Sequence, residues 1–189
     1  MVSQVPVVEA VSQGGMVKVI GRIKKIWLES FLPAPYAEDP NGFDWLAAEI
    51  MQPGGIYQIA RSGDEVVGFA QGRKRDKSEQ PSDWERELVR SVGEPAVGEC
   101  IYDQFAISCI AVSPEWRGRH LGGALHDGLL QTVRSPRAWL ITYPFDCPAL
   151  TLYRRRGWQL LGSAALGSGG SERLILSRQL DHDCSRDGG

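Results

Sequence analysis

The residues with the clearest capacity for chemistry lie in "RGRHLGG", residues 117–123, a basic turn that contains three glycines. Arg117 and Arg119 supply guanidinium donors, and glycines let a backbone curl tightly around an anion. At the start of a helix, outward-pointing N–H groups and the helix dipole also attract negative charge. The turn therefore predicts a phosphate-binding site, although an ordinary strand-to-helix turn with solvated arginines has the same composition.

The segments on both sides of this turn have the periodicity that such a site requires. Before it, "AISCIAV", residues 106–112, is a continuous apolar run typical of a buried strand. After it, apolar residues recur at helical spacing, namely Leu121, Ala124, Leu125, Leu129 and Val133. A strand, a glycine turn and a helix start are thus predicted in succession, which is the arrangement of a phosphate site at a helix N-terminus.

Two common nucleotide-binding motifs do not fit these residues. A P-loop needs a Lys-Ser or Lys-Thr pair after its glycines, and none follows here. The dinucleotide fingerprint is G-x-G-x-x-G, whereas residues 118–123 read "GRHLGG". The sequence also offers no plausible set of carboxylates for magnesium. A nucleotide-phosphate enzyme is therefore disfavoured.

The composition indicates an ordinary globular protein with a local, rather than global, anion site. Of the 189 residues, 42% are hydrophobic and 23% charged, and the formal net charge is −2. Such a balance offers no broad basic surface for nucleic acid or membrane. No secretory leader and no apolar run of about 20 residues is present, so we expect a cytoplasmic protein.

The cysteines and histidines predict no disulfide framework and no metal site. The cysteines show no C-x-x-C pairing, which favours free, mostly buried thiols in a reducing compartment. His120 and His126 are six residues apart, which does not place them on one face of a helix. The four cysteines are Cys100, Cys109, Cys147 and Cys184.

The remaining segments predict one α/β domain over residues 1–180 with a mixed sheet. An insertion at 74–98 has Ser82 and Glu85 at capping-box spacing. It could be a lid, an oligomer contact or, most simply, a solvated connector. Residues 181–189 form a polar tail that we expect to be disordered. The other predicted elements are strands at 5–11 and 138–145, hairpins at 56–73 and 158–180, and helices at 14–32, within 35–51 and at 148–157.

With these elements in place, the sequence resembles the GCN5-related N-acetyltransferases (GNAT). Their acetyl-CoA motif is [R/Q]-x-x-G-x-[G/A] after a strand, and residues 117–122 match it except at His120, where a glycine is usual. The lead-in "IAVSPEWRG", residues 110–118, is similar to the family's V-x-P-x-x-R-G. The match at this loop alone would be weak.

A second segment at the expected distance strengthens the resemblance. Residues 146–162 resemble the family's N-x-x-A-x-x-x-Y-x-x-x-G-F segment. Ala149, Tyr153 and Gly157 are in register, whereas Asp146 stands for the usual Asn and Trp158 for the usual Phe. Two motifs in register and in the expected element order make the resemblance cover most of residues 56–178.

The resemblance implies a fold and a cofactor. The implied fold is α/β, with a mixed, mostly antiparallel central sheet flanked by helices and splayed at the acetyl-CoA site. The backbone of residues 110–112 would pair with the pantetheine arm of acetyl-CoA, and the loop of 117–123 would hold its pyrophosphate. The implied cofactor-binding residues are Ile110, Ala111, Val112, Arg117, Gly118, Arg119, His120, Leu121, Gly122, Gly123, Asp146, Ala149 and Tyr153. No metal is implied. We expect the His120 side chain to point outward from the loop.

The resemblance also implies direct transfer of an acetyl group to an amine. Tyr153 would donate a proton to the leaving CoA thiolate, although helix spacing alone favours a core tyrosine. A general base is expected because an ordinary amine is protonated at neutral pH. The family often has a carboxylate near the position of Ala106; the nearest acidic residues are Asp103 and Glu99. Asp103 is the candidate base, and a solvated strand-start residue is the alternative.

The sequence does not specify the amine acceptor or the oligomeric state. Aminoglycosides, polyamines, amino acids, peptide N-termini and lysine side chains all fit a primary-amine acceptor. Acidic and aromatic residues at 33–45 would suit a cationic amine, although a solvated proline-rich turn explains them too. A homodimer is a family-level expectation. The departures at His120 and Asp146, and the missing carboxylate, leave one alternative function, a catalytically inactive acyl-CoA-binding regulatory module.

Overall fold

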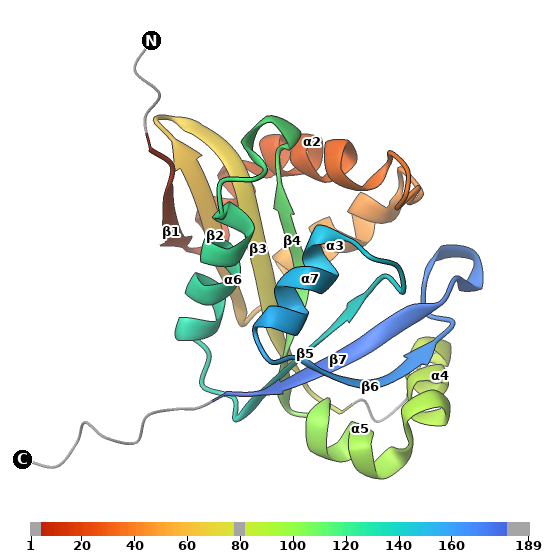
Figure 1. Cartoon of the computed structure of the whole chain (residues 1–189). Coiled ribbons are helices and arrows are strands. Elements are labelled where there is room, and N and C mark those ends of the chain that lie inside the picture. Colours follow the sequence, from red (N-terminus) through yellow and green to blue (C-terminus); the bar gives the residue numbers. More distant parts are fainter. Residues whose placement is uncertain (1–4, 78–81, 181–189) are drawn as a thin grey trace, which may run out of the picture. The chain divides into compact units, whose positions relative to one another are not determined.

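The computed structural model describes residues 5–77 and 82–180, and the predicted tail at 181–189 lies outside them. The strands are β1 (Val7–Val11), β2 (Gly55–Ser62), β3 (Glu65–Arg75), β4 (Gln104–Val112), β5 (Arg137–Thr142), β6 (Gln159–Ala164) and β7 (Arg173–Gln179). They follow the order β1-β2-β3-β4-β5-β7-β6 in one mostly antiparallel sheet, which confirms the predicted fold class (Figure 1).

Helices flank the strands. The helices are α1 (Gln13–Lys18), α2 (Ile20–Phe31), α3 (Gly42–Met51), α4 (Asp83–Val92), α5 (Glu94–Cys100), α6 (Leu121–Gln131) and α7 (Pro148–Arg155), with short 3-10 turns η1 (Pro114–Trp116) and η2 (Ser168–Gly170). By its contacts the chain divides into two compact units. Unit 1 comprises residues 1–73 and 107–133, and unit 2 comprises 74–106 and 134–189.

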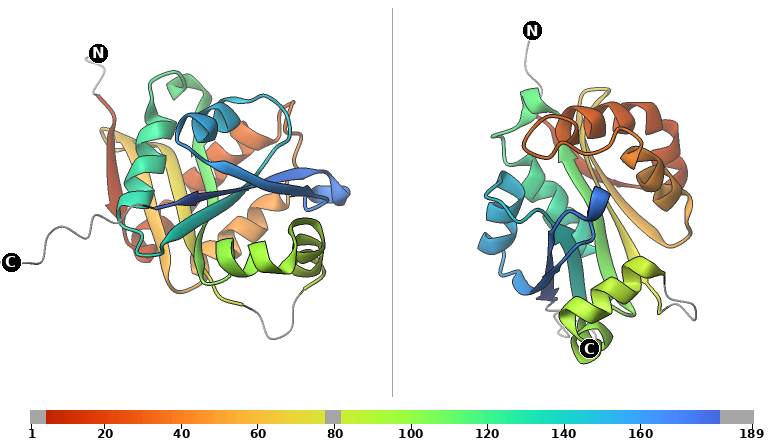
Figure 2. Two further views of the ribbon diagram at one scale, coloured as in Figure 1. Left: turned by 60° about the horizontal axis from the view of Figure 1, so that its bottom comes forward. Right: turned by 90° about the vertical axis from the view of Figure 1, so that its right-hand side faces the viewer.

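The strands of unit 1 carry apolar side chains on both faces. Successive residues of a strand point to opposite faces, so Phe69 and Gly68 of β3 face different layers. Phe69 is fully buried in a cluster with Ile26 of α2 and Leu46 of α3. Gly68 faces Leu125 of α6 instead. Figure 2 shows this arrangement, with α2 and α3 on one side of the unit 1 strands and α6 on the other.

The helix predicted over residues 14–32 is divided in two at Val19. There the backbone adopts φ −108° and ψ 13°, and the Val19 N–H donates to Met16 O. A β-branched valine followed by Ile20 and Gly21 has low helix propensity, which favours a break at this point. Ser12 caps α1 by accepting a hydrogen bond from the Gly15 N–H.

Where the structure describes the insertion at 74–98, it contains two helices of unit 2, α4 and α5. Ser82 and Glu85 form the predicted capping box at the start of α4. Leu88 of α4 and Val97 of α5 are buried against Trp139 of β5. Figure 2 shows α7 on the side of β5 and β7 away from α4 and α5. Burial of Leu88 and Val97 makes α4 and α5 part of the packed core of unit 2.

A substitution at Gly68 of β3 tests how closely α6 approaches the strands of unit 1. A Cβ at Gly68 would lie 3.1 Å from both Ala111 O and Leu125 Cδ1. We expect Gly68→Ala to lower the free energy of unfolding by about 1–3 kcal/mol because the core must shift to accept it. Gly21→Ala is the control, since nothing lies within 4 Å of its added Cβ. Equal chemical-denaturation midpoints for the two variants would contradict this packing.

Candidate functional site

The predicted phosphate-binding turn leaves β4 on a rigidly held segment of unit 1. Ser113, which follows β4, is fully buried, and its N–H donates to Val67 O at 2.9 Å. The η1 turn follows, and the chain then passes through Gly118 and His120 in left-handed conformations, with φ values of 75° and 61°. Alternating conformations of this kind aim backbone N–H groups into a shared concavity, which suits an anion.

Helix α2 fixes this turn through two arginines. Arg22 of α2 donates from Nε to Val66 O at 2.8 Å and from a terminal nitrogen to Ser113 Oγ at 3.3 Å. In the other direction, Arg117 of the turn donates to Ser30 Oγ of α2 at 3.1 Å. The turn is therefore braced from both ends by side chains that lie far away in the sequence.

The structure gives Arg117 a positioning role in the turn. Its Nε donates to Val112 O at 3.1 Å, in addition to the hydrogen bond with Ser30. Both contacts lie within unit 1; the first closes the turn on the end of β4, and the second ties it to α2. With this guanidinium engaged by protein oxygens, we expect the backbone N–H groups to supply the main donors for an anion.

His120 occupies the N-cap position of α6 and is exposed, as predicted. Its left-handed φ of 61° explains why the resembled family usually has glycine at this position, because a side chain raises the energy of that conformation. No side-chain cap hydrogen bond is made by His120. The departure from the family pattern is thus a matter of backbone strain and not of lost backbone donors.

The start of α6 fits an anionic cofactor such as acetyl-CoA. The helix has 11 residues, and the first N–H groups of any helix have no intrahelical partner. No heavy atom lies within 4 Å of a Cβ built on Gly118 or Gly122, so both glycines border open space. Leu121 and Leu125 are buried and anchor the helix below the turn.

The end of β4 alternates between the core and its surroundings. Ala111 is buried in the core of unit 1, whereas Ile110 and Val112 are half-buried.

Burial raises the pKa of the Cys109 thiol well above its usual range, so this thiol stays protonated. Like Cys100 and Cys147, it is a free, buried cysteine, whereas Cys184 lies outside the described residues.

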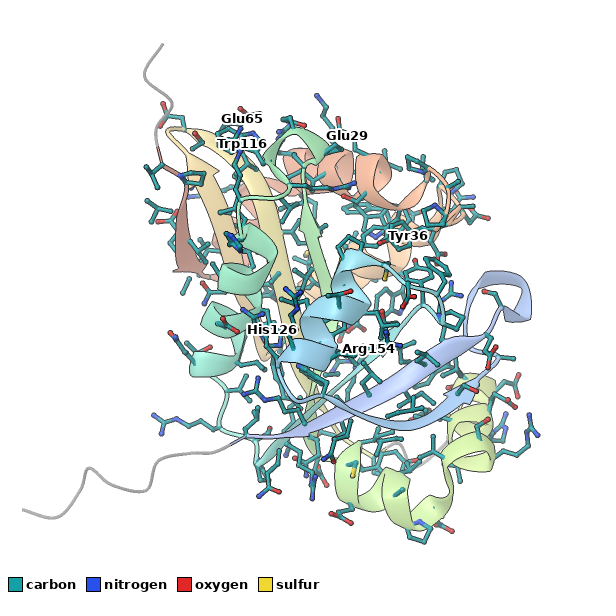
Figure 3. All side chains as sticks on the ribbon, viewed as in Figure 1. Glu29, Tyr36, Glu65, Trp116, His126 and Arg154 are labelled. Carbon is teal, nitrogen blue, oxygen red and sulfur yellow. The ribbon has the colours of Figure 1, made fainter. Side chains whose placement is uncertain are left out.

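Tyr153 lies on α7 in unit 2. It is 7% exposed and packs edge-on against Trp158, with ring centroids 5.8 Å apart. Asp146 precedes the helix and accepts a hydrogen bond at 3.0 Å from Arg154, which Figure 3 labels on α7. Ala149 is half-buried in the first turn. Cys147 caps the helix by accepting from the Leu150 N–H.

The acidic residues considered as a general base lie at the start of β4 and on α5. Asp103 adopts a left-handed φ of 61° in the turn before β4, and its N–H donates to Arg75 O at 2.7 Å. Its exposed carboxylate lies 3.4 Å from Lys74 Nζ. Glu99 pairs with Arg137 at 2.7 Å. Its geometry gives Asp103 a place in a turn, and its role as a base stays a prediction.

Three residues that matter to unit 1 were not given their structural roles from the sequence. Ser30 has no local signal, since its partner Arg117 lies 87 residues away. Trp116, labelled in Figure 3 just before α6, could have been noticed as an aromatic beside two arginines. His126 of α6 is fully buried, and its Nδ1 lies 2.7 Å from Asp127 Oδ1. A histidine in a helix core has no distinctive spacing.

Residues 5–77 and 82–180 contain neither a metal-binding cluster nor a membrane-spanning helix. Within these ranges, no cluster of three or more His, Cys, Asp or Glu side chains could hold a metal ion. Over the same ranges, none of the helices combines the length and apolar character needed to cross a membrane.

The comparisons with known proteins agree with this fold. The sequence profile of the acetyltransferase (GNAT) family matches residues 21–158, so the chain belongs to the GNAT acetyltransferase family. Members of this family transfer acetyl groups from acetyl-CoA, and the turn at the start of α6 fits that cofactor. No curated protein matches the chain.

Solved structures share the fold at low sequence identity. Ard1 from Thermoplasma volcanium has a TM-score of 0.63 and 16% identity, with 94% of this chain and 99% of that chain covered. The ribosomal-protein-S18-alanine N-acetyltransferase of Escherichia coli has 0.63 and 12%, with 98% and 100% covered. A putative acetyltransferase from Salmonella typhimurium, solved with acetyl-CoA, has 0.57 and 14%, with 97% and 99% covered.

His120→Gly tests the strain at the N-cap of α6. Glycine removes the left-handed cost of about 1–3 kcal/mol but loses part of that gain to the entropy of the unfolded chain. We therefore expect the free energy of unfolding to stay equal or rise by about 1 kcal/mol, measured by urea denaturation. Affinity for CoA should change only slightly. A clear loss of stability would show that the His120 side chain stabilises the turn.

Proposed function

We propose that this protein is an N-acetyltransferase that moves the acetyl group of acetyl-CoA directly to a primary amine of a small molecule or protein. The observation that carries the proposal is the braced turn before α6, whose glycines and left-handed residues leave backbone N–H groups for a pyrophosphate. Membership of the GNAT family supports the same cofactor. Its free, buried cysteines favour a reducing compartment, and we propose a cytoplasmic location.

The chain's own residues would bind the cofactor mainly through backbone atoms. We propose that Gly118, Leu121, Gly122 and Gly123 present N–H groups to the pyrophosphate, and that residues 110–112 pair with the amides of the pantetheine arm. Pairing of an extended ligand with strand backbone is a common mode of recognition. The Val112 carbonyl already accepts from Arg117, which keeps the end of β4 in one position.

The transfer requires one bond to form and one to break. The neutral amine attacks the thioester carbonyl, a C–N bond forms, and the C–S bond breaks to release the CoA thiolate. We propose that the Tyr153 hydroxyl donates its proton to this sulfur, while a base takes the proton that the amine loses. Asp103 is the proposed base, directly or through water. The Tyr153 hydroxyl is then reprotonated by solvent or by the proton that the base took from the amine.

The acceptor is proposed to be cationic before it reacts, and residues 33–45 in unit 1 support this class. Tyr36 packs edge-on against Phe31, with ring centroids 5.6 Å apart, and Figure 3 labels Tyr36 in this segment. Lys24 Nζ lies 5.6 Å from the centroid of the Phe43 ring, within cation–π range. Trp45 is 54% exposed beside the acidic Asp44.

Tyr153→Phe tests the enzyme assignment when CoA release is measured with a panel of amines. Loss of the proton donor should lower kcat about 10²–10⁴-fold with little change in the affinity for acetyl-CoA. Asp103→Asn, run in parallel, keeps the turn because asparagine tolerates the left-handed conformation, and it should lower kcat similarly if Asp103 is the base. CoA binding without turnover for any amine would favour the inactive regulatory module instead.

A further inference from the structure

The second arginine of the turn, Arg119, is engaged quite differently from Arg117. The guanidinium carbon of Arg119 lies 4.6 Å from the centroid of the Trp116 ring, within cation–π range. Its side chain is exposed. Among the residues that the structure describes, Arg119 donates no hydrogen bond and forms no ion pair. Its hydrogen-bond donors are therefore available to a ligand.

The stacking of Arg119 on Trp116 orients the N–H donors of the guanidinium without occupying them. A guanidinium group that lies on an aromatic face keeps its N–H bonds in its own plane, so they point outward around the rim. The main chain beneath the ring is held in η1, where the backbone N–H of Trp116 donates to Ser113 O at 2.9 Å, and Ser113 is fully buried. The stack on Trp116 therefore favours one direction for the Arg119 guanidinium beside the turn.

Because backbone N–H groups are the donors proposed for the pyrophosphate, the unused donors of Arg119 can serve a second phosphate of the same cofactor. Arg119 directly precedes His120, the N-cap of α6, so it stands next to the backbone donors proposed for the pyrophosphate. CoA carries a third phosphate on its ribose, at the 3′ position. A terminal phosphate of this kind has a charge of about −1.5 to −2 and three acceptor oxygens, which suit the planar fork of an arginine.

We propose that Arg119, stacked on Trp116, binds the 3′-phosphate of CoA. The inference rests on the proposed function and adds a selectivity to it. The protein then distinguishes free acetyl-CoA from acetyl donors that lack this phosphate, namely 3′-dephospho-CoA and the phosphopantetheine arm of a carrier protein. In this arrangement Arg117 holds the turn and backbone N–H groups bind the pyrophosphate. Arg119 binds the 3′-phosphate at the nucleotide end of acetyl-CoA.

Calorimetric titration with CoA and with 3′-dephospho-CoA tests this assignment. Wild-type protein should bind CoA at least about tenfold more tightly, as expected for charge-assisted hydrogen bonds. Arg119→Met should weaken binding of CoA by the same factor and leave binding of 3′-dephospho-CoA within about twofold. The variant then no longer distinguishes the two ligands.

Two control variants separate recognition from a general loss of basic charge or of loop structure. Arg61→Met removes another arginine of unit 1, whose Nε bonds to Glu9 at 2.8 Å, and should keep the preference for CoA. Trp116→Phe should largely keep the preference because an aromatic face remains beneath the guanidinium, whereas Trp116→Ala should reduce it.

Three results would overturn the inference. Equal affinity of the wild-type protein for both ligands would show that the 3′-phosphate is not recognised. An equal loss of affinity for both ligands in Arg119→Met would assign Arg119 to the pyrophosphate or to loop structure. Failure of wild-type protein to bind either ligand would overturn the proposed function as well, so the two failures are distinguishable.

Discussion

The guanidinium group of Arg117 joins the end of β4 to α2, through Val112 O and Ser30 Oγ, both at 3.1 Å. These two hydrogen bonds use donors that a basic glycine turn would otherwise offer to an anion. In exchange, the turn has one defined course from Ser113 to the start of α6. The backbone donors of α6 and the stacked side chain of Arg119 both depend on that course, so the proposed binding of an anion by unit 1 depends on intramolecular hydrogen bonds of Arg117.

Much of the fold could be predicted from the sequence because local signals and tertiary packing agree. The hairpin of β2 and β3 follows from two β-prone runs around Gly63, which has the positive φ that a tight turn needs. The capping box of Ser82 and Glu85 likewise marks the start of α4. The break at Val19 and the packing of α4 and α5 were missed. Both depend on which apolar residues meet in space, and periodicity alone does not specify that.

The position of the candidate site could be predicted from the sequence, but the separate roles of its residues could not. The spacing of Arg117, His120 and Gly122 located the turn, yet the type of a residue does not reveal its partner. Ser30 lies 87 residues from Arg117, so the contact that occupies this arginine has no sequence signal. The left-handed backbone of His120 could be inferred only because the resembled family has glycine there. Arg119 and Arg117 look equivalent in sequence and differ in the structure.

The most direct test of this account is a titration of ¹⁵N-labelled protein with CoA, followed by two-dimensional NMR. Backbone binding of the pyrophosphate predicts that the amide resonances of Gly118 and of residues 121–123 shift most, while the Arg117 Nε–H resonance stays in place because its hydrogen bond to Val112 persists. Unmoved amides at the start of α6, together with a shifted Arg117 side-chain resonance, would contradict it.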